Sequence, residues 1–164
     1  GLMAVCDIVV AAEDAMFSLS EARLGLIPAV IAPFLLRKAG ESFLRRYALT
    51  GETFTTSVAH RFGLVHDVVP QSDLDDRITE VIDAIRQLAP RATRATKGVI
   101  LRIRPLPDQE REVTCAEANA SARAASEAIE GLRAFAEKRP PQWAKEQQPA
   151  REIAKEHHVA SRPT

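Results

Sequence analysis

The chain begins with short apolar runs and continues with helical stripes. Residues 1–19 contain two apolar runs, CDIVVAA and AMFSL, which the acidic pair Glu13-Asp14 separates. Apolar runs of this length, bounded by turn residues, predict buried strands. After Glu21 the apolar positions recur at helical spacing in short pieces, the first of which ends at Gly40. The pattern therefore predicts two short strands that lead to one carboxylate, Glu21, where sheet changes to helix.

A third helix and a strand are predicted in the middle of the chain. Thr55 or Thr56 can cap this helix, Gly63 ends it, and residues 64–69 form a strand closed by Pro70. The next helix carries an apolar stripe whose spacings match 3.6 residues per turn. The stripe consists of Leu74, Ile78, Val81, Ile82 and Ile85.

The last part of the chain is predicted to be mainly helical. Pro90 starts a helix that runs to about Ile103, and a long helical region follows from Asp108 to about Arg139. Strands thus come first and helices later, which predicts an α/β core followed by a helical subdomain. We expect a core over residues 1–89, a helical subdomain over 90–143 and a flexible polar tail over 144–164.

Composition limits the classes of partner. The 164 residues include 22 basic and 22 acidic side chains, so no net charge attracts nucleic acid or an anionic membrane. No apolar run approaches the roughly 20 residues of a membrane span. No secretory signal is visible, and a cytoplasmic location is expected. Cys6 and Cys115 are expected to be free thiols, as in a reducing compartment.

Motifs for several kinds of site are missing from the sequence. The chain has no G-x-S-x-G elbow, no P-loop and no G-x-G-x-x-G. The four histidines are not spaced as a metal-ligand set, so no metal site is predicted. These histidines are His60, His66, His157 and His158.

Two sets of residues have a functional and an ordinary interpretation. Arg91, Arg94 and Lys97 recur on one face of a predicted helix, where a solvated face is more common than an anion site. Phe135 and Lys138 are predicted to share a helix face. Taken alone, this pair is an ordinary aromatic residue beside a surface lysine.

Glu21 also has two interpretations. A glutamate in a first helical turn after a serine is more often a helix-start residue than a catalyst. The segment before Glu21 is apolar, however, and Gly25 and Ala29 follow it. Small residues allow backbone N–H groups to approach a ligand. Local patterning leaves both interpretations open.

The stretch CDIVVAAEDAMFSLSEARLGLIP resembles the enoyl-CoA hydratase/isomerase (crotonase) superfamily. Further motifs of that family occur in the same order, and the resemblance covers residues 1–143. They are Leu49-Thr50-Gly51, Ala59-x-x-x-Gly63-Leu64-Val65, Val68-Val69-Pro70 and the ending from Glu130-Gly131-Leu132 to Lys138-Arg139. The resemblance implies an α/β crotonase-like fold of ββα units, followed by a helical C-terminal subdomain.

The resemblance also implies site residues. Glu21 matches the second catalytic glutamate of the family. Ala29 matches the small residue after the family's proline, here Pro28, and its backbone N–H helps to position the reacting water. Phe135 and Lys138 match positions that reach the CoA bound by a neighbouring subunit. An acyl-CoA is thus the expected substrate, no separate cofactor is implied, and a homotrimer or hexamer is the expected assembly.

Three departures from the family pattern change this expectation. Gly1 stands at the position of the first catalytic glutamate, and the sequence from Pro28 to Pro33 replaces a glycine-rich loop. Both features look like the branch that hydrates methylglutaconyl-CoA or isohexenylglutaconyl-CoA, in leucine and acyclic terpene breakdown. The family's two oxyanion-hole donors fall before Gly1, so the chain looks like the C-terminal portion of a longer enzyme.

The expected reaction is addition of water to the 2,3 double bond of an enoyl-CoA, within fatty acid or leucine metabolism. One alternative is an enoyl-CoA isomerase, in which a single carboxylate moves a proton between carbons. Another is an inactive fragment that only associates with partner subunits through its helices.

Overall fold

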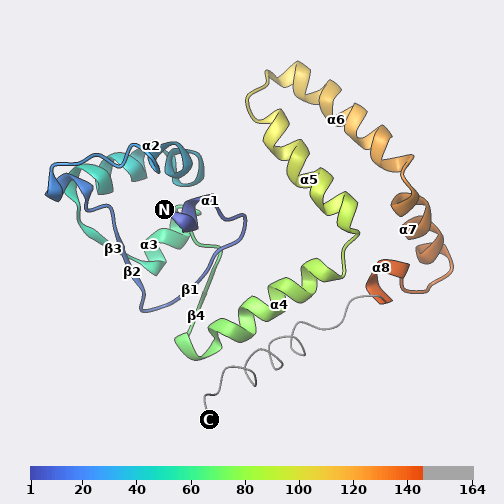
Figure 1. The fold of residues 1–164 in the computed structure, drawn as a ribbon, viewed down its shortest axis with the longest axis horizontal. Helices are drawn as coiled ribbons and strands as arrows, with labels where there is room; N and C mark the ends of the chain where they lie inside the picture. Colours follow the sequence, from blue (N-terminus) through green and yellow to red (C-terminus); the bar gives the residue numbers. More distant parts are fainter. Residues whose placement is uncertain (146–164) are drawn as a thin grey trace, which may run out of the picture. The chain divides into compact units, whose positions relative to one another are not determined.

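The computed structural model describes residues 1–145 (Figure 1). Two compact units divide between Ile78 and Thr79, within helix α4 (Leu74–Arg86). The compact units divide before the domain boundary that the sequence predicts between residues 89 and 90. That boundary stays a prediction. Most of the predicted tail, with His157 and His158, lies outside the described residues.

The first unit contains two pairs of strands, each three residues long. β1 (Val10–Ala12) is parallel to β4 (Asp67–Val69), and β2 (Met16–Ser18) is antiparallel to β3 (Thr53–Thr55). In the register, Val10 lies opposite Asp67 and Phe17 opposite Phe54. Only part of each predicted strand therefore pairs, and the start of the chain forms a short helix, α1 (Leu2–Val5).

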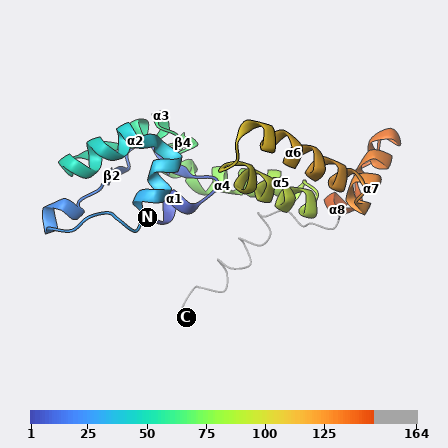
Figure 2. The same cartoon turned by 90° about the horizontal axis from the view of Figure 1, so that it is seen from above.

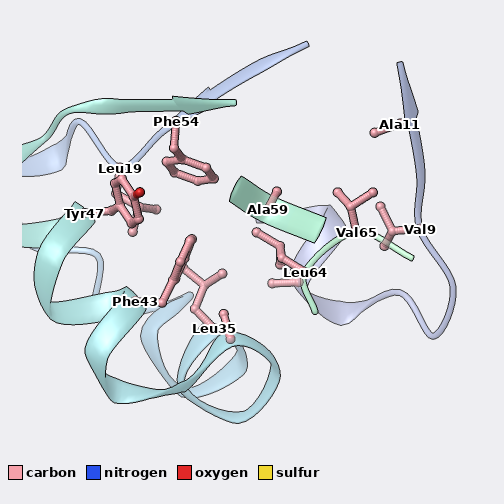
Figure 3. Close-up of a cluster of buried hydrophobic side chains, with 12 residues drawn as sticks. Val9, Ala11, Leu19, Leu35, Phe43, Tyr47, Phe54, Ala59, Leu64 and Val65 are labelled. Carbon is pink, nitrogen blue, oxygen red and sulfur yellow. The ribbon is translucent and has the colours of Figure 1, made fainter. Parts of the chain in front are cut away.

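Aromatic side chains form the centre of the first unit's core (Figure 3). Phe43 is 1% exposed, and its ring centroid lies 4.8 Å from that of Tyr47 and 5.1 Å from that of Phe54. The Phe43–Phe54 pair is edge-to-face, a favoured arrangement of aromatic rings. Leu64 and Val65, just before β4, are also buried, so the core joins the helices to both strand pairs.

The helices of the first unit begin and end close to the predicted residues. α2 (Ala32–Thr50) is kinked at Gly40, whose φ of 85° is accessible mainly to glycine. The Thr55 side chain accepts a hydrogen bond from the Val58 N–H at 3.3 Å and so caps α3 (Thr56–Arg61). The predicted break at Gly40 and the predicted threonine cap are thus confirmed.

Thr56 joins α3 to the two strands before the site. Its fully buried hydroxyl group donates to the carbonyl of Ala12 at 2.7 Å and to that of Ala15 at 3.0 Å. These carbonyls flank the turn between β1 and β2. The hydroxyl therefore fixes the path of the chain into β2 and towards Glu21.

The second unit is helical, as predicted. After α4, which begins in the first unit, it contains α5 (Pro90–Ile103), α6 (Asp108–Arg123), α7 (Ser126–Ala136) and α8 (Gln142–Lys145). α5 and α6 lie side by side in both views (Figure 1 and Figure 2). Within residues 1–145, no helix combines the length and the apolar character needed to cross a membrane.

The helical region predicted from Asp108 to about Arg139 consists of two helices, α6 and α7. The helical path breaks at Ala125, whose ψ of 149° is extended, and α7 ends at Ala136. The apolar stripe of α4 is partly exposed, with Ile78, Ile82 and Ile85 between 38% and 43% exposed.

Candidate functional site

Glu21 lies where the second strand changes to helix. β2 ends at Ser18, Leu19 is buried, and Glu21 begins the short 3₁₀ helix η1 (Glu21–Leu24). Gly25 follows with a φ of 71°, and the Leu26 N–H donates to the Glu21 carbonyl at 3.0 Å. The backbone on both sides of the carboxylate is therefore fixed, as a proton-transfer group requires.

One oxygen of the Glu21 carboxylate has no hydrogen-bond partner. Among the described residues, Oε2 of Glu21 is the only buried side-chain nitrogen or oxygen atom without one. A buried polar atom without a partner is unfavourable and needs an explanation. A substrate or a reacting water that binds beside Glu21 would supply the missing partner.

The segment after η1 carries the predicted loop residues and an apolar surface. The Pro28 carbonyl accepts from the Ala32 N–H at 2.9 Å, which leads the chain into α2, and Ala29 is exposed. Ile27 and Val30 are 78% and 83% exposed. Glu21, Pro28 and Ala29 thus belong to one continuous segment, in which large apolar side chains face outwards.

Gly1 lies against the same segment. A Cβ atom at Gly1 would lie 3.3 Å from Cγ2 of Ile31. α1 is held to α2 by the Lys38 ammonium, which donates to the carbonyls of Met3 at 3.2 Å and Cys6 at 2.6 Å. Burial lowers the pKa of Lys38. The position that matches the family's first glutamate therefore contacts an apolar side chain.

Phe135 and Lys138 belong to the second unit. The prediction that they share a helix face is wrong, because α7 ends at Ala136 and Lys138 adopts a φ of 53°. Phe135, in the last turn of α7, is 84% exposed. An exposed aromatic residue and a nearby exposed lysine remain available for a ligand at this end of the helix.

The second unit contains a cavity of about 910 Å³ that the sequence analysis missed. Small residues of α5, α6 and α7 line most of it, and Trp143 closes part of it. Arg91, Arg94 and Lys97 are all exposed, and of the three only Arg91 lines this cavity. The recurrent alanines of these helices were the sequence signal for a space between them.

The histidines of residues 1–145 contact backbone groups, and the two cysteines are not joined in a disulfide. The Nδ1 atom of His66 accepts from the Val9 N–H at 3.0 Å, and Nδ1 of His60 lies 3.2 Å from the Val65 carbonyl oxygen. No group of three or more potential metal ligands occurs in this part of the chain. Cys6 and Cys115 are free thiols, as predicted.

Comparison with known proteins decides the family. Residues 1–147 match the sequence model of the family described as enoyl-CoA hydratase/isomerase. The chain belongs to this family. The predicted α/β crotonase-like fold is thereby confirmed, and solved structures of the enoyl-CoA hydratase/isomerase family have the same fold.

Three members of the enoyl-CoA hydratase/isomerase family show how far the similarity extends. Mevalonyl-coenzyme A hydratase of Aspergillus fumigatus is 35% identical, over 87% of this chain and 54% of its own length. Carnitinyl-CoA dehydratase of Salmonella agona is 33% identical, over 87% of this chain and 56% of its own. The crystal structure of an enoyl-CoA hydratase from Shewanella pealeana is 39% identical, with a TM-score of 0.81 over 87% of this chain and 53% of that one. The chain spans about half the length of the relatives it matches.

Proposed function

We propose that this member of the enoyl-CoA hydratase/isomerase family adds water to the 2,3 double bond of an enoyl-CoA thioester. The observation that carries the proposal is the buried, unpartnered Oε2 of Glu21. Glu21 matches a catalytic glutamate of the family, and two strands and a 3₁₀ helix fix its backbone. A carboxylate in such a place is suited to proton transfer.

In the proposed reaction, Glu21 takes a proton from water while the water oxygen adds to C3 of the substrate. The electrons of the double bond move towards the thioester oxygen, and the resulting enolate then takes the proton at C2. Because Gly1 stands at the first glutamate position, Glu21 acts both as the base and as the acid. The net change is the addition of one water molecule.

Hydrogen-bond donors must stabilise the enolate oxygen during this addition. Removing one such donor typically costs about 3 kcal/mol in activation free energy. We assign the proton transfer to residues 1–145. We propose that the two backbone N–H donors for the enolate oxygen lie in the part of the relatives' length that this chain does not span.

We also propose that Phe135 and Lys138 bind the CoA of a neighbouring subunit, in a trimer or hexamer. An exposed aromatic ring can stack on adenine, and an ammonium group can pair with a phosphate. Both side chains are exposed, which supports this role.

For the acyl group we propose a glutaconyl-CoA of the methylglutaconyl or isohexenylglutaconyl type. The loop from Pro28 to Pro33 and the glycine at position 1 support this choice. The relatives named above act on different acyl groups, according to their names, so substrate choice needs its own measurement.

The test uses a form of the protein as long as its relatives, with crotonyl-CoA and methylglutaconyl-CoA as substrates. We expect the absorbance of the conjugated thioester to fall and the product mass to rise by one water. A product of unchanged mass with a moved double bond would replace this proposal by an isomerase. Failure to bind either acyl-CoA would favour a non-catalytic role in subunit association.

A further inference from the structure

Lys138 has an unusual backbone conformation for its residue type. Among the described residues it is the only one other than glycine with a positive φ, 53°. The Arg139 N–H donates to the Ala134 carbonyl at 3.0 Å, and the Lys138 N–H donates to the Phe135 carbonyl at 3.2 Å. This pair of hydrogen bonds is the Schellman motif, which ends many helices. Glycine usually occupies its left-handed position, because a Cβ atom is unfavourable there.

Arg139 fixes the chain just after Lys138. Its Nη1 and Nη2 atoms donate to the two carboxylate oxygens of Glu130, at 2.7 and 3.1 Å, and its Nε donates to Glu137 at 2.6 Å. The Gln142 N–H also donates to Glu130, at 3.1 Å. We call Glu130, Glu137 and Arg139 the Arg139 clamp. It ties the residues on both sides of Lys138 to α7.

The opposite charges of the clamp stabilise the ionised forms of Arg139 and Glu130. Its hydrogen bonds raise the pKa of Arg139, and the bond from Arg139 lowers the pKa of Glu130. A bidentate arginine–carboxylate pair is also strongly directional. The clamp is therefore a fixed support for the turn rather than a loose surface pair.

The Lys138 side chain takes no part in the clamp. It is exposed, and no hydrogen bond or ion pair of its ammonium group occurs within residues 1–145. A lysine thus occupies a position where glycine would be less strained. Its ammonium group has no partner among the described residues. Strained backbone positions of this kind concentrate at functional sites.

We infer that the Arg139 clamp is a positioning device that holds Lys138 in its left-handed conformation and directs its ammonium group towards a phosphate of CoA. The inference rests on the proposed function, in which Lys138 contacts CoA. Arg139 and Glu130 would then be positioning residues that act through Lys138 and touch no substrate themselves.

The test measures the binding of CoA, 3′-dephospho-CoA and pantetheine by calorimetry, in a form of the protein as long as its relatives. Lys138→Ala should weaken CoA binding about tenfold, as expected for one charge-assisted contact, and leave pantetheine binding unchanged. Arg139→Met should weaken CoA binding as well. The double variant should bind CoA no more weakly than Lys138→Ala alone, because both changes remove one contact. Arg133→Met, which removes the same charge from α7 outside the clamp, is the matched control.

Lys138→Gly distinguishes the effect of the left-handed backbone conformation from the effect of the lysine side chain. It should weaken CoA binding as much as Lys138→Ala does, yet raise the melting temperature above that of the unaltered chain. Glu137→Gln, which replaces the charged acceptor of the 2.6 Å contact by a neutral amide, should give a smaller loss of CoA binding and serves if Arg139→Met does not fold. The dephospho-CoA arm identifies the phosphate that Lys138 contacts.

The outcomes separate this inference from the proposed function. If Lys138→Ala weakens CoA binding but neither Arg139→Met nor Glu137→Gln does so, the positioning role is wrong and the proposed function stands. Losses that multiply in the double variant would also overturn it, since Arg139 would then act independently. If Lys138→Ala binds CoA normally, the proposed Lys138 contact is wrong, and the inference fails with it.

Discussion

Glu127 caps helix α5 from another helix. Its Oε1 atom accepts a hydrogen bond from the Arg91 N–H at 3.0 Å, and its Oε2 accepts from the Ala92 N–H at the same distance. The first N–H groups of a helix have no partner within it, and Ala89, the residue at the N-cap, offers no side-chain acceptor. A carboxylate on α7 thus satisfies the start of α5 and also complements its dipole.

Replacing Glu127 should therefore loosen the second unit. We expect Glu127→Ala to lower the free energy of unfolding by about 1–3 kcal/mol, since two N–H groups lose a charged acceptor. Glu127→Gln keeps one acceptor oxygen and should lose less. Urea unfolding followed by circular dichroism measures both changes. Glu112→Ala, at an exposed position of α6, is the control and should change stability little.

Removing the Thr56 hydroxyl should destabilise the first unit. Thr56→Val keeps the shape of the side chain but deletes the donor to Ala12 and Ala15. The expected loss is about 1–2 kcal/mol of unfolding free energy, as for a buried hydrogen bond. The same substitution at Thr53, which is exposed in β3, should cost much less. Equal losses in the two variants would show that the hydroxyl at position 56 contributes nothing particular.

A methyl group at Gly131 should displace the chain's single tryptophan. A Cβ atom there would lie 3.1 Å from the Trp143 ring, which is closer than normal packing allows. We expect Gly131→Ala to move the ring and shift its fluorescence emission to longer wavelength.

Gly98→Ala provides the control for this change, because Gly98 is also helical but has nothing within 4 Å of its Cβ position. It should leave the fluorescence unchanged and stabilise α5 by about 0.5–1 kcal/mol through helix propensity. An unshifted Gly131→Ala spectrum would mean that the ring does not pack on this glycine.

Acid should weaken the turn after α7. The hydrogen bond from Arg139 lowers the pKa of Glu130 below its ordinary value, so the folded state binds this proton less tightly than the unfolded state does. The resulting stabilisation is present above the ordinary glutamate range and is lost as the pH falls through the lowered pKa. The melting temperature, followed from about pH 7 to about pH 3, should fall less steeply in Glu130→Gln. Glu110→Gln should follow the unaltered chain.

Glu21→Gln tests the proposed proton transfer. In a form of the protein as long as its relatives, this change should reduce kcat for hydration about 10²- to 10⁴-fold, the usual contribution of a general acid or base. Binding of the acyl-CoA should persist, because glutamine keeps the size of the side chain. Glu13→Gln, in the exposed turn between β1 and β2, should retain full turnover. Hydration that survives in Glu21→Gln would remove Glu21 from the mechanism.

Local sequence predicts the features of the first unit that depend on one residue's conformation. Gly40 and Gly63 adopt positive φ values, and Thr55 offers a hydroxyl at the start of α3, so each carries its own signal. β3 has no such signal, because three residues are too few to establish a period. Its pairing with β2 is a property of the tertiary structure.

The features that sequence analysis missed involve residues with strong helix propensity. Alanine and lysine favour helices, so nothing local marks the break at Ala125 or the left-handed backbone of Lys138. The conformation of Lys138 goes with side-chain contacts of the Arg139 clamp, which residue propensity does not reveal. The candidate site also combines a feature visible in the sequence with one that depends on the tertiary structure. Glu21 was found by resemblance, whereas the absence of a partner for its Oε2 depends on side-chain packing.

The two strand pairs are nested along the chain. The ladder that joins Val10 to Asp67 encloses the ladder that joins Met16 to Thr55. Formation of the inner pair shortens the free chain between β1 and β4, so less loop entropy remains to be lost when the outer pair forms. We therefore expect this unit to fold from the inside outwards. Glu21, in the loop that the inner pair closes, would then be constrained before β1 meets β4.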